Sequence, residues 1–443
     1  MALSRRRFLT QTARLAAGAA LSAPYVVPGS VFGADAPSNR VTIGMIGVGR
    51  QAFFANLPPF LHFEDTQVVA VCDVDSRRLD KAKQETEKFY AGKNASGTFK
   101  GCSTFRDFRE LLARPDIDAV MISTPDHWHV PMALAAARAG KDIALEKPIT
   151  MSIDEGRLLS DTVRRYGRVF RTDSEVRSQW FFHRAAELVR NGRIGKLHTI
   201  RTGVPRDTFT APAAAELPVP EELDYDMWLG PAAKAPYTEN RVHPRQSYER
   251  PGWMRVRDYC DGMICNWGTH LNDIAQWGNN TERTGPVEIE AHGTYPPFDG
   301  LWNVVFDFEA WYRFANGVQM YYTMSRPYVR FEGDQGWVEA DWSKNTLAAQ
   351  PESLLKEQIG SGGIHFPLKT EKRDFIDCIK TRGRTLADAE VGHRTTSLCH
   401  LAHISIQLGG QRLKWDPDKE VFADNEFANR LTKRSALRAP WTL

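Results

Sequence analysis

Small residues follow an apolar run near the start of the chain with a spacing that suits phosphate binding. The run Val41–Ile46 leads into G-x-G-x-x-A, with Gly47, Gly49 and Ala52 at the small positions. In a dinucleotide site the first glycine permits a tight turn, the second lets the backbone approach the pyrophosphate, and the third small residue lets a helix pack on the strand. Asp73 follows 21 residues after Ala52, where a carboxylate would accept the ribose hydroxyls. The set predicts a nicotinamide dinucleotide site; the alternative is a cofactor-free parallel sheet in which Asp73 caps a helix.

Two polar segments follow later apolar runs, at residues 123–129 and 146–148. Both are expected at the carboxyl ends of parallel strands, where open sheets bind ligands. In the second segment the ammonium of Lys147 can polarise a substrate oxygen. Its structural alternative is a salt bridge to Glu146.

These segments require an alternating β/α scaffold. Apolar strands are predicted at residues 41–46, 68–72, 118–122 and 141–145, with helices beginning near residue 51 and at 76–89 and 130–139. A parallel sheet is the economical interpretation.

The composition shifts near residue 152. Helices are predicted at 153–166, 183–191, 372–380 and 391–408, and strands at 196–204, 287–294 and 301–308, near Val329 and near Trp337, with a hairpin at Asn316 and Gly317. The series predicts an open, largely antiparallel sheet. The aromatic tail at 439–443 is expected to be docked.

The glycine turn, a T-P-x-x-x-H loop from Thr124 to His129 and an E-K-P loop at Glu146 occur in the order that is typical of the Gfo/Idh/MocA oxidoreductases, which this chain resembles. The resemblance implies an α/β fold with an N-terminal Rossmann domain and a C-terminal α+β domain, whose sheet faces the cofactor and often forms a dimer interface. A homo-oligomer is therefore expected. The residues expected to bind the cofactor are Gly47, Gly49, Ala52, Asp73, Thr124, Pro125, His129, Glu146 and Lys147.

Many proteins of this family also carry D-x-x-x-H, with both side chains facing the cleft. This chain keeps His270 but has Asn266 in place of the aspartate. An asparagine can fix the tautomer of an imidazole, but it cannot stabilise imidazolium as a carboxylate does. The predicted catalytic residues are Lys147, which holds the reacting oxygen, His270, which is the acid/base, and Asn266, which orients His270.

The flat faces of aromatic side chains pack against the C–H groups of a sugar, and polar side-chain ends form hydrogen bonds with its hydroxyls. The residues expected to bind substrate are Trp128, Trp253, Arg255, Tyr259 and Asp273. The bias toward a sugar or polyol comes from the resemblance, and Trp128 has a core position as its alternative. A metal site at His127, His129, His270 and Asp273 lacks tight ligand spacing, so no metal is predicted.

The net charge and the N-terminal segment limit which partners are expected. With 57 basic and 54 acidic side chains the net charge is +3, and no long basic run occurs beyond the N-terminus, so nucleic acid is not an expected partner. Ser4, three arginines, Phe8 and Leu9 precede a mild Ala-rich stretch, which predicts a twin-arginine signal peptide over residues 1–36 and export to the periplasm. The stretch is too mild for stable membrane insertion.

The six cysteines do not have the spacing of a disulfide scaffold, although Cys260 and Cys265 are close enough in sequence to be bridged. The chain divides into the signal peptide, a dinucleotide domain at 37–151 and a substrate domain at 152–443. Asp73 favours NAD by repelling a 2′-phosphate, while Arg77 keeps NADP as an alternative.

The predicted function is an exported NAD(P)-dependent oxidoreductase that acts on a hydroxyl of a sugar, polyol or glycoside with a tightly held cofactor. One alternative is an NAD-dependent glycosidase, in which transient oxidation at C3 acidifies the C2–H, the leaving group is eliminated and the hydride is returned. The other alternative is a non-catalytic periplasmic sugar-binding protein.

Overall fold

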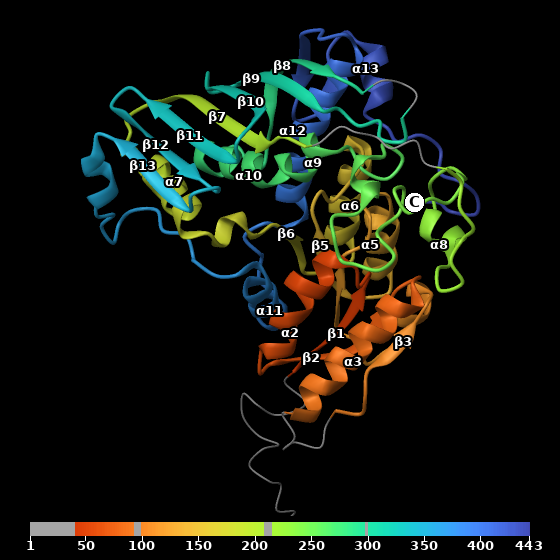
Figure 1. The fold of residues 1–443 in the computed structure, drawn as a ribbon. Helices are drawn as coiled ribbons and strands as arrows, with labels where there is room; N and C mark the ends of the chain where they lie inside the picture. The colour runs from red at the N-terminus through yellow and green to blue at the C-terminus, as the bar shows by residue number, and fades with distance from the viewer. Residues whose placement is uncertain (1–39, 93–98, 208–214, 297–299) are drawn as a thin grey trace, which may run out of the picture. The chain divides into compact units, whose positions relative to one another are not determined.

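The first apolar run forms β1 (Val41–Ile46), an inner strand of a parallel sheet (Figure 1). The computed structural model describes residues 40–92, 99–207, 215–296 and 300–443, so the predicted signal peptide at 1–36 lies outside the described residues. The strand order is β3-β2-β1-β4-β5-β6, and all five pairings are parallel. Successive strands are added to one side of β1 up to β3 and to its other side from β4 onward, and parallel sheets bind ligands where the strand order reverses in this way. The other strands are β2 (Thr66–Cys72), β3 (Ser103–Phe105), β4 (Ala119–Ile122), β5 (Asp142–Glu146) and β6 (Phe170–Asp173).

Helices cover both faces of this sheet. One face packs against α4 (Phe108–Leu112), α5 (His129–Arg138) and α6 (Ile153–Arg165). The other packs against α2 (Leu57–His62), α3 (Ser76–Gly92) and α11 (Glu371–Thr381). The sheet thus continues past residue 151, where the sequence placed a domain boundary, because β6 pairs with β5 and α11 returns to cover the sheet.

The second sheet has nine strands in the order β13-β12-β11-β7-β10-β9-β8-β14-β15, and only the β10–β7 pair is parallel. This confirms the predicted fold class. The strands are β7 (Leu197–Pro205), β8 (Pro286–Thr294), β9 (Asp307–Phe314), β10 (Gln319–Ser325), β11 (Tyr328–Gly333), β12 (Gly336–Asp341), β13 (Thr346–Gln350), β14 (Leu413–Asp416) and β15 (Val421–Phe422).

Alternate residues of these strands are buried, as β9 shows, because helices pack on one face of the sheet. Figure 1 shows α10 (Gly268–Asn279) and α12 (Ala389–Gln407) against the strands, with α7 (Trp180–Arg190) toward β12. Every residue of α10 is buried. The remaining helices are α8 (Tyr225–Leu229), α9 (Met263–Asn266) and α13 (Glu426–Leu431), with short η turns between elements.

One predicted strand is wrong. The segment 301–308 was expected to be extended, but β9 begins only at Asp307. The preceding residues contact loops instead: the Trp302 indole N–H donates to the Asn240 carbonyl and the Asn303 N–H donates to the Arg255 carbonyl. The predicted docking of the tail is confirmed, because the Trp441 ring lies 4.6 Å from the Trp128 ring.

Among the described residues, no helix combines the length and the apolar character that a membrane span needs. All six cysteines are buried and free. Cys260 and Cys265 are not bridged, because Cys260 Sγ accepts from the Gly262 N–H while Cys265 Sγ faces Asp261 and His400.

Candidate active site

The glycine turn lies at the carboxyl end of β1, and its conformation requires small residues. Gly47 has φ +80°, and a Cβ there would lie 2.8 Å from the Ser123 carbonyl oxygen. A Cβ at Gly49 would meet nothing within 4 Å, so this backbone faces open space. Ala52 is buried and begins the π-helical turn η3 (Ala52–Asn56), which continues into α2. The open backbone at a helix start fits a pyrophosphate.

Asp73 follows β2 and lines the same pocket as Gly47 and Gly49. Its carboxylate accepts from the N–H of Val48 at 2.8 Å and from that of Asp75 at 2.9 Å. Desolvation raises the pKa of Asp73, although these two hydrogen bonds oppose the shift. The carboxylate is thereby fixed beside the glycine turn, as a ribose acceptor would be.

The loops that follow β4 and β5 are joined by His129. Its Nδ1 lies 2.7 Å from the Pro148 carbonyl oxygen, and its Nε2 lies 2.9 Å from that of Thr124. Burial lowers the pKa of His129 to about 4, although the contacts with the two carbonyl oxygens oppose this shift. Thr124 and Pro125 line the pocket but His129 does not, so it positions both loops rather than lining the predicted cofactor site.

Lys147 and Glu146 have different environments. Lys147 lines the pocket and donates from Nζ to the Asn266 carbonyl oxygen at 3.0 Å. Glu146 is buried and accepts from Asn56 Nδ2 at 2.8 Å. Burial, together with the nearby Asp173, raises the pKa of Glu146 to about 8. Lys147 is thus held through a backbone carbonyl, and among the described residues it makes no other hydrogen bond, so two of its three N–H donors remain for a ligand.

Asn56, which does not itself line the pocket, supports two residues that do, and the sequence did not point to it. It belongs to the π-helical turn and also donates to Ser123 Oγ at 2.9 Å. A π turn offsets side chains from ordinary helical spacing, so periodicity did not reveal it.

Asn266 does not orient His270 as predicted. Asn266 ends α9, and α10 begins at Gly268, so the two residues do not share one continuous helical face. Ser174 Oγ lies 2.9 Å from His270 Nδ1, and no hydrogen bond joins the side chains of Asn266 and His270 within the described ranges. Burial and the charge of Lys147 hold the pKa of His270 well below its usual value. Asn266 lines the pocket, whereas His270 does not.

The predicted substrate residues divide into two groups. Trp128 and Trp253 line the pocket. Arg255, Tyr259 and Asp273 do not.

Each residue outside the pocket has a partner elsewhere. Arg255 forms a bidentate pair with Asp207 at 2.8 and 3.0 Å. Asp273 forms one with Arg177 at 2.7 Å on both arms. Tyr259 is fully buried, with its ring 4.8 Å from that of Trp228. Likewise, the residues of the rejected metal alternative contact different partners: the Trp228 carbonyl for His127, Pro148 for His129, Ser174 for His270 and Arg177 for Asp273.

Residues 243–254 lie over the pocket, and we call them the covering segment. Its members that line the pocket are His243, Glu249, Pro251, Trp253 and Met254. Arg78 Nη2 donates to the carbonyls of Pro244 at 3.0 Å and Ser247 at 3.2 Å, and Arg77 Nη2 donates to that of Arg245 at 2.8 Å. The start of α3 therefore holds the segment over the cofactor pocket.

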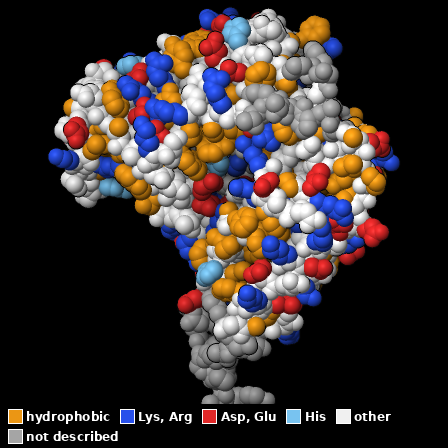
Figure 2. Space-filling view, viewed as in Figure 1, with side chains coloured by type: hydrophobic (Ala, Val, Ile, Leu, Met, Phe, Trp, Pro, Cys, Tyr) orange, Lys and Arg blue, Asp and Glu red, His pale blue; other side chains and the backbone are white. Residues whose placement is uncertain are grey.

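An aromatic contact adds to this attachment. The Tyr248 ring stacks on Phe53 with centroids 5.0 Å apart, and the neighbouring Phe54 is 62% exposed. Figure 2 shows hydrophobic side chains gathered on this face, over the region where Figure 1 places α2. The sequence position of Arg77 suggested that it could bind a 2′-phosphate. In the structure Arg77 pairs with Glu222 and does not line the pocket, whereas Arg78 does.

Two family models match this chain. The NAD-binding Rossmann fold model of the Gfo/Idh/MocA oxidoreductases matches residues 41–174, and the model of their C-terminal alpha/beta domain matches residues 210–443. The chain belongs to the Gfo/Idh/MocA oxidoreductase family. The first match includes the glycine turn, Asp73 and both loops, and this Gfo/Idh/MocA chain is an oxidoreductase whose cofactor is NAD.

Curated relatives match over a limited stretch. "Glycosyl hydrolase family 109 protein 1" of Shewanella sp. (strain ANA-3) is 38% identical over 137 residues, 31% of this chain and 29% of the relative. "Alpha-N-acetylgalactosaminidase" of Shewanella oneidensis is 36% identical over 159 residues, 35% of this chain and 34% of the relative. The chain therefore matches about a third of the length of these relatives.

Solved structures share the fold over most of the chain. An aldose-aldose oxidoreductase from Caulobacter crescentus, complexed with glycerol, has a TM-score of 0.62 at 18% identity. The WlbA dehydrogenase from Bordetella pertussis, in complex with NADH and UDP-GlcNAcA, has a TM-score of 0.62 at 15% identity. Each match covers 85% of this chain and 99% of the other. At such identities the likeness concerns the fold.

Proposed function

We propose that this Gfo/Idh/MocA oxidoreductase acts with NAD on a hydroxyl of a sugar, polyol or glycoside and keeps its cofactor tightly bound. The observation that carries the proposal is Lys147, whose ammonium is held by the Asn266 carbonyl at the pocket that the glycine turn and Asp73 also line. Carbohydrate ligands and substrates in the names of the relatives and solved neighbours support the substrate class.

The residues that would hold NAD are the backbone at Gly47 and Gly49, Asp73 for the ribose, and Thr124. Thr124 Oγ1 fits this role because it is buried and has no hydrogen-bond partner among the described residues. When bound, the nicotinamide accepts a hydride from the substrate carbon or returns it.

In the proposed reaction, Lys147 donates a hydrogen bond to the reacting oxygen. His270 does not itself line the pocket, but it lies close enough to Lys147 for the ammonium to add to the lowering of its pKa by burial. In this proposal it accepts the hydroxyl proton at Nε2 when substrate is bound, while Ser174 holds its Nδ1. The carbon of the CH–OH group would give up a hydride to the nicotinamide and its oxygen a proton to His270, which leaves a carbonyl.

The test uses the purified full chain with a panel of free and glycosidic sugars, read by nicotinamide absorbance and by product mass. We expect at least one sugar to change the absorbance. Lys147→Ala should lower turnover by about 100-fold or more while the dinucleotide stays bound, and Lys234→Ala, on an exposed surface lysine, should not. Near-normal turnover of a folded Lys147→Ala protein would reject the role of Lys147.

A second candidate function is the NAD-dependent glycosidase. It is favoured by the two glycosyl hydrolase relatives, which match about a third of their own length. The same experiment separates the two, because a glycosidase releases the aglycone without accumulation of NADH. Membership of an oxidoreductase family favours either enzyme over the sugar-binding alternative.

Export to the periplasm by the twin-arginine route is part of the proposal and rests on Ser4 to Leu9. Cell fractionation of the full chain and of an Arg5→Lys, Arg6→Lys variant tests it. The wild type is expected in the periplasmic fraction and the variant in the cytosol; equal distribution contradicts export by this route.

A homo-oligomer is also proposed, through the face of the nine-stranded sheet that the helices leave uncovered. Half-buried Trp311, Tyr321 and Trp337 alternate there with buried residues. Light scattering of the wild type and of Trp311→Glu is the test, and a monomeric wild type rejects the proposal.

A further inference from the structure

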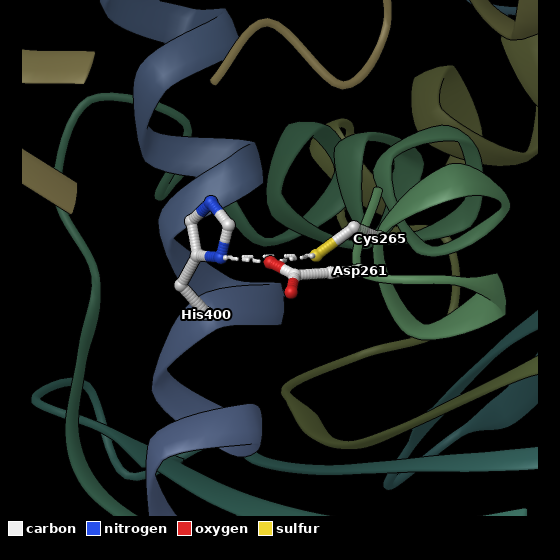
Figure 3. A group of neighbouring side chains, drawn as sticks. All are labelled: Asp261, Cys265 and His400. Carbon is white, nitrogen blue, oxygen red and sulfur yellow. Dashed lines mark hydrogen bonds and ion pairs between the residues drawn. The ribbon is translucent and has the colours of Figure 1, made fainter. Parts of the chain in front are cut away.

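Three side chains capable of metal coordination meet away from the cofactor pocket, where α9 approaches α12. Asp261 lies just before α9, Cys265 lies in α9, and His400 lies in the middle of α12 (Figure 3). All three are buried, and their potential ligand atoms lie within 4.8 Å of one another. None was assigned a function by the sequence analysis.

The distances suit three corners of a tetrahedron. His400 Nδ1 lies 3.1 Å from Asp261 Oδ2, and Cys265 Sγ lies 3.8 Å from each of these atoms. Around Zn²⁺, with bonds of about 2.0 Å to O or N and about 2.3 Å to S, tetrahedral angles separate the ligand atoms by roughly 3.3–3.6 Å. Shifts of a few tenths of an ångström would close the observed triangle around the ion.

The outer contacts orient the ligands. His400 Nε2 lies 3.3 Å from the Thr150 carbonyl oxygen, which can only accept. Nε2 therefore carries a hydrogen, and Nδ1 is the ring nitrogen that faces Asp261 and Cys265 and could bind a metal through its lone pair. The other carboxylate oxygen, Asp261 Oδ1, lies 3.3 Å from His403 Nδ1, and Tyr295 Oη lies 3.0 Å from His403 Nε2. Metal-ligating imidazoles and carboxylates have such second partners.

We propose that Asp261 Oδ2, Cys265 Sγ and His400 Nδ1 bind a zinc ion that joins α9 to α12. A carboxylate, a thiolate and a neutral imidazole around Zn²⁺ sum to zero charge, which a buried position requires. On binding, the Cys265 thiol loses its proton to solvent and the S–Zn bond forms. The mixed sulfur, nitrogen and oxygen donor set suits Zn²⁺ better than Ca²⁺ or Mg²⁺.

The ion would stabilise the backbone segments that position Lys147. Cys265 directly precedes Asn266, whose carbonyl holds the Lys147 ammonium. Thr150, which contacts His400, lies three residues after Lys147. Without a metal, the same contacts require His400 to be an imidazolium paired with Asp261, and the Cys265 thiol to donate to that carboxylate.

Metal analysis distinguishes the two arrangements. The full chain is expressed in zinc-supplemented medium, purified with a histidine-free tag and analysed by mass spectrometry for metal per chain. We expect about one zinc in the wild type and in the control Cys102→Ser, which removes a buried thiol elsewhere, and under a tenth in Cys265→Ser. Removal of zinc with a strong chelator should lower the thermal midpoint of the wild type and leave that of Cys265→Ser unchanged.

A spectroscopic measurement on the wild type covers the case in which Cys265→Ser fails to fold. Cobalt added to the metal-stripped protein should give a thiolate-to-cobalt charge-transfer band in the near ultraviolet, and Cys102→Ser should give the same band. The proposal is overturned if this band does not form, or if Cys265→Ser retains as much zinc as the wild type. Neither measurement depends on enzymatic activity, so the zinc site and the proposed function fail separately.

Discussion

At the scale of single residues, Ser174 is the side chain that holds His270. We expect His270→Ala to lower turnover by about 100-fold or more, because it removes the proton acceptor. Ser174→Ala should lower turnover by roughly tenfold and change the pH dependence of kcat, because the ring keeps its position in the core but loses the partner of Nδ1. Asn266→Asp should cost less than His270→Ala, since the Asn266 carbonyl rather than its side chain holds Lys147.

The control for Ser174 is Ser178→Ala. The turn η5 (Glu175–Ser178) directly follows Ser174, and Ser178 is its last residue. The Ser178 hydroxyl donates to Glu371 rather than to His270. Its pH profile should match that of the wild type. If Asn266→Asp proves more damaging than His270→Ala, the assignment of His270 as the proton acceptor is wrong.

Asp126 gives a prediction about stability. It lines the pocket, its Oδ2 has no hydrogen-bond partner among the described residues, and burial raises its pKa to about 8. As pH rises from about 4 to about 8, the unfolded carboxyl ionises while the folded one stays protonated, so this group makes the free energy of unfolding fall. The side chain introduced by Asp126→Asn cannot ionise. The free energy of unfolding of this variant, relative to that of the wild type, should therefore be higher at pH 8 than at pH 5 by a few kcal/mol (order of magnitude).

Urea unfolding of the cofactor-free protein at both pH values measures this difference. Asp80→Asn, at an exposed position on α3, is the control and should follow the wild type. If the free energy of unfolding changes by the same amount between the two pH values in the wild type and in Asp126→Asn, then Asp126 is already ionised in the folded protein.

The sequence predicted those site residues whose positions follow from local rules. Asp73 and Lys147 directly follow parallel strands and Thr124 is the second residue after one, so their convergence on one pocket could be expected. Arg255 and Asp273 lie outside this pocket and form ion pairs with residues 48 and 96 positions away in sequence, and no local pattern reveals such pairs.

At the scale of elements, the covering segment and α3 decide how a bound dinucleotide is enclosed. Arg78→Ala removes two hydrogen bonds to the segment and the ion pair with buried Asp75. We therefore expect NAD to dissociate about tenfold faster or more, and the thermal midpoint of the cofactor-free protein to fall. Arg77→Ala should have a smaller effect in the same direction, since Arg77 is half-exposed and makes one such bond. Stopped-flow release of NADH fluorescence measures both.

Arg78 lines the pocket and Arg77 does not. A comparison of Arg77→Ala with Arg78→Ala therefore distinguishes an effect of the covering segment from direct contact between the arginine and the dinucleotide. Arg164→Ala, on an exposed arginine of α6, is the matched control and should leave release unchanged. Faster release in Arg78→Ala alone would mean that Arg78 acts on the dinucleotide directly and that the segment does not limit release.

The elements themselves were largely predictable, and the exceptions have physical causes. Strands β1, β2, β4 and β5 are short apolar runs bounded by polar turns, which period and length identify. The segment 301–308 is also apolar, but it packs against loops at Asn240 and Arg255 instead of a neighbouring strand. Apolar character predicts burial, and only the partner decides whether a buried segment is a strand.

At the scale of the whole molecule, the proposed export and the enclosed pocket lead to one prediction about the cofactor. Twin-arginine export carries folded chains, and the periplasm has no dependable supply of free nicotinamide cofactor. NAD bound before export would also stabilise the folded state by mass action. The covering segment, fixed by Arg77, Arg78 and the Phe53–Tyr248 stack, provides a physical means of retention.

We therefore expect the mature protein to carry close to one NAD per chain after purification from the periplasm. Denaturation and mass spectrometry of the supernatant give this ratio, and side-by-side affinities for NAD and NADP should favour NAD because the Asp73 carboxylate repels a 2′-phosphate. A retained cofactor must be reoxidised or reduced within the catalytic cycle or by a second substrate, which favours paired oxidation and reduction or the glycosidase over a dehydrogenase that releases NADH. Well under one equivalent of dinucleotide, with activation by added NAD, would show that the cofactor exchanges and that the covering segment does not retain it.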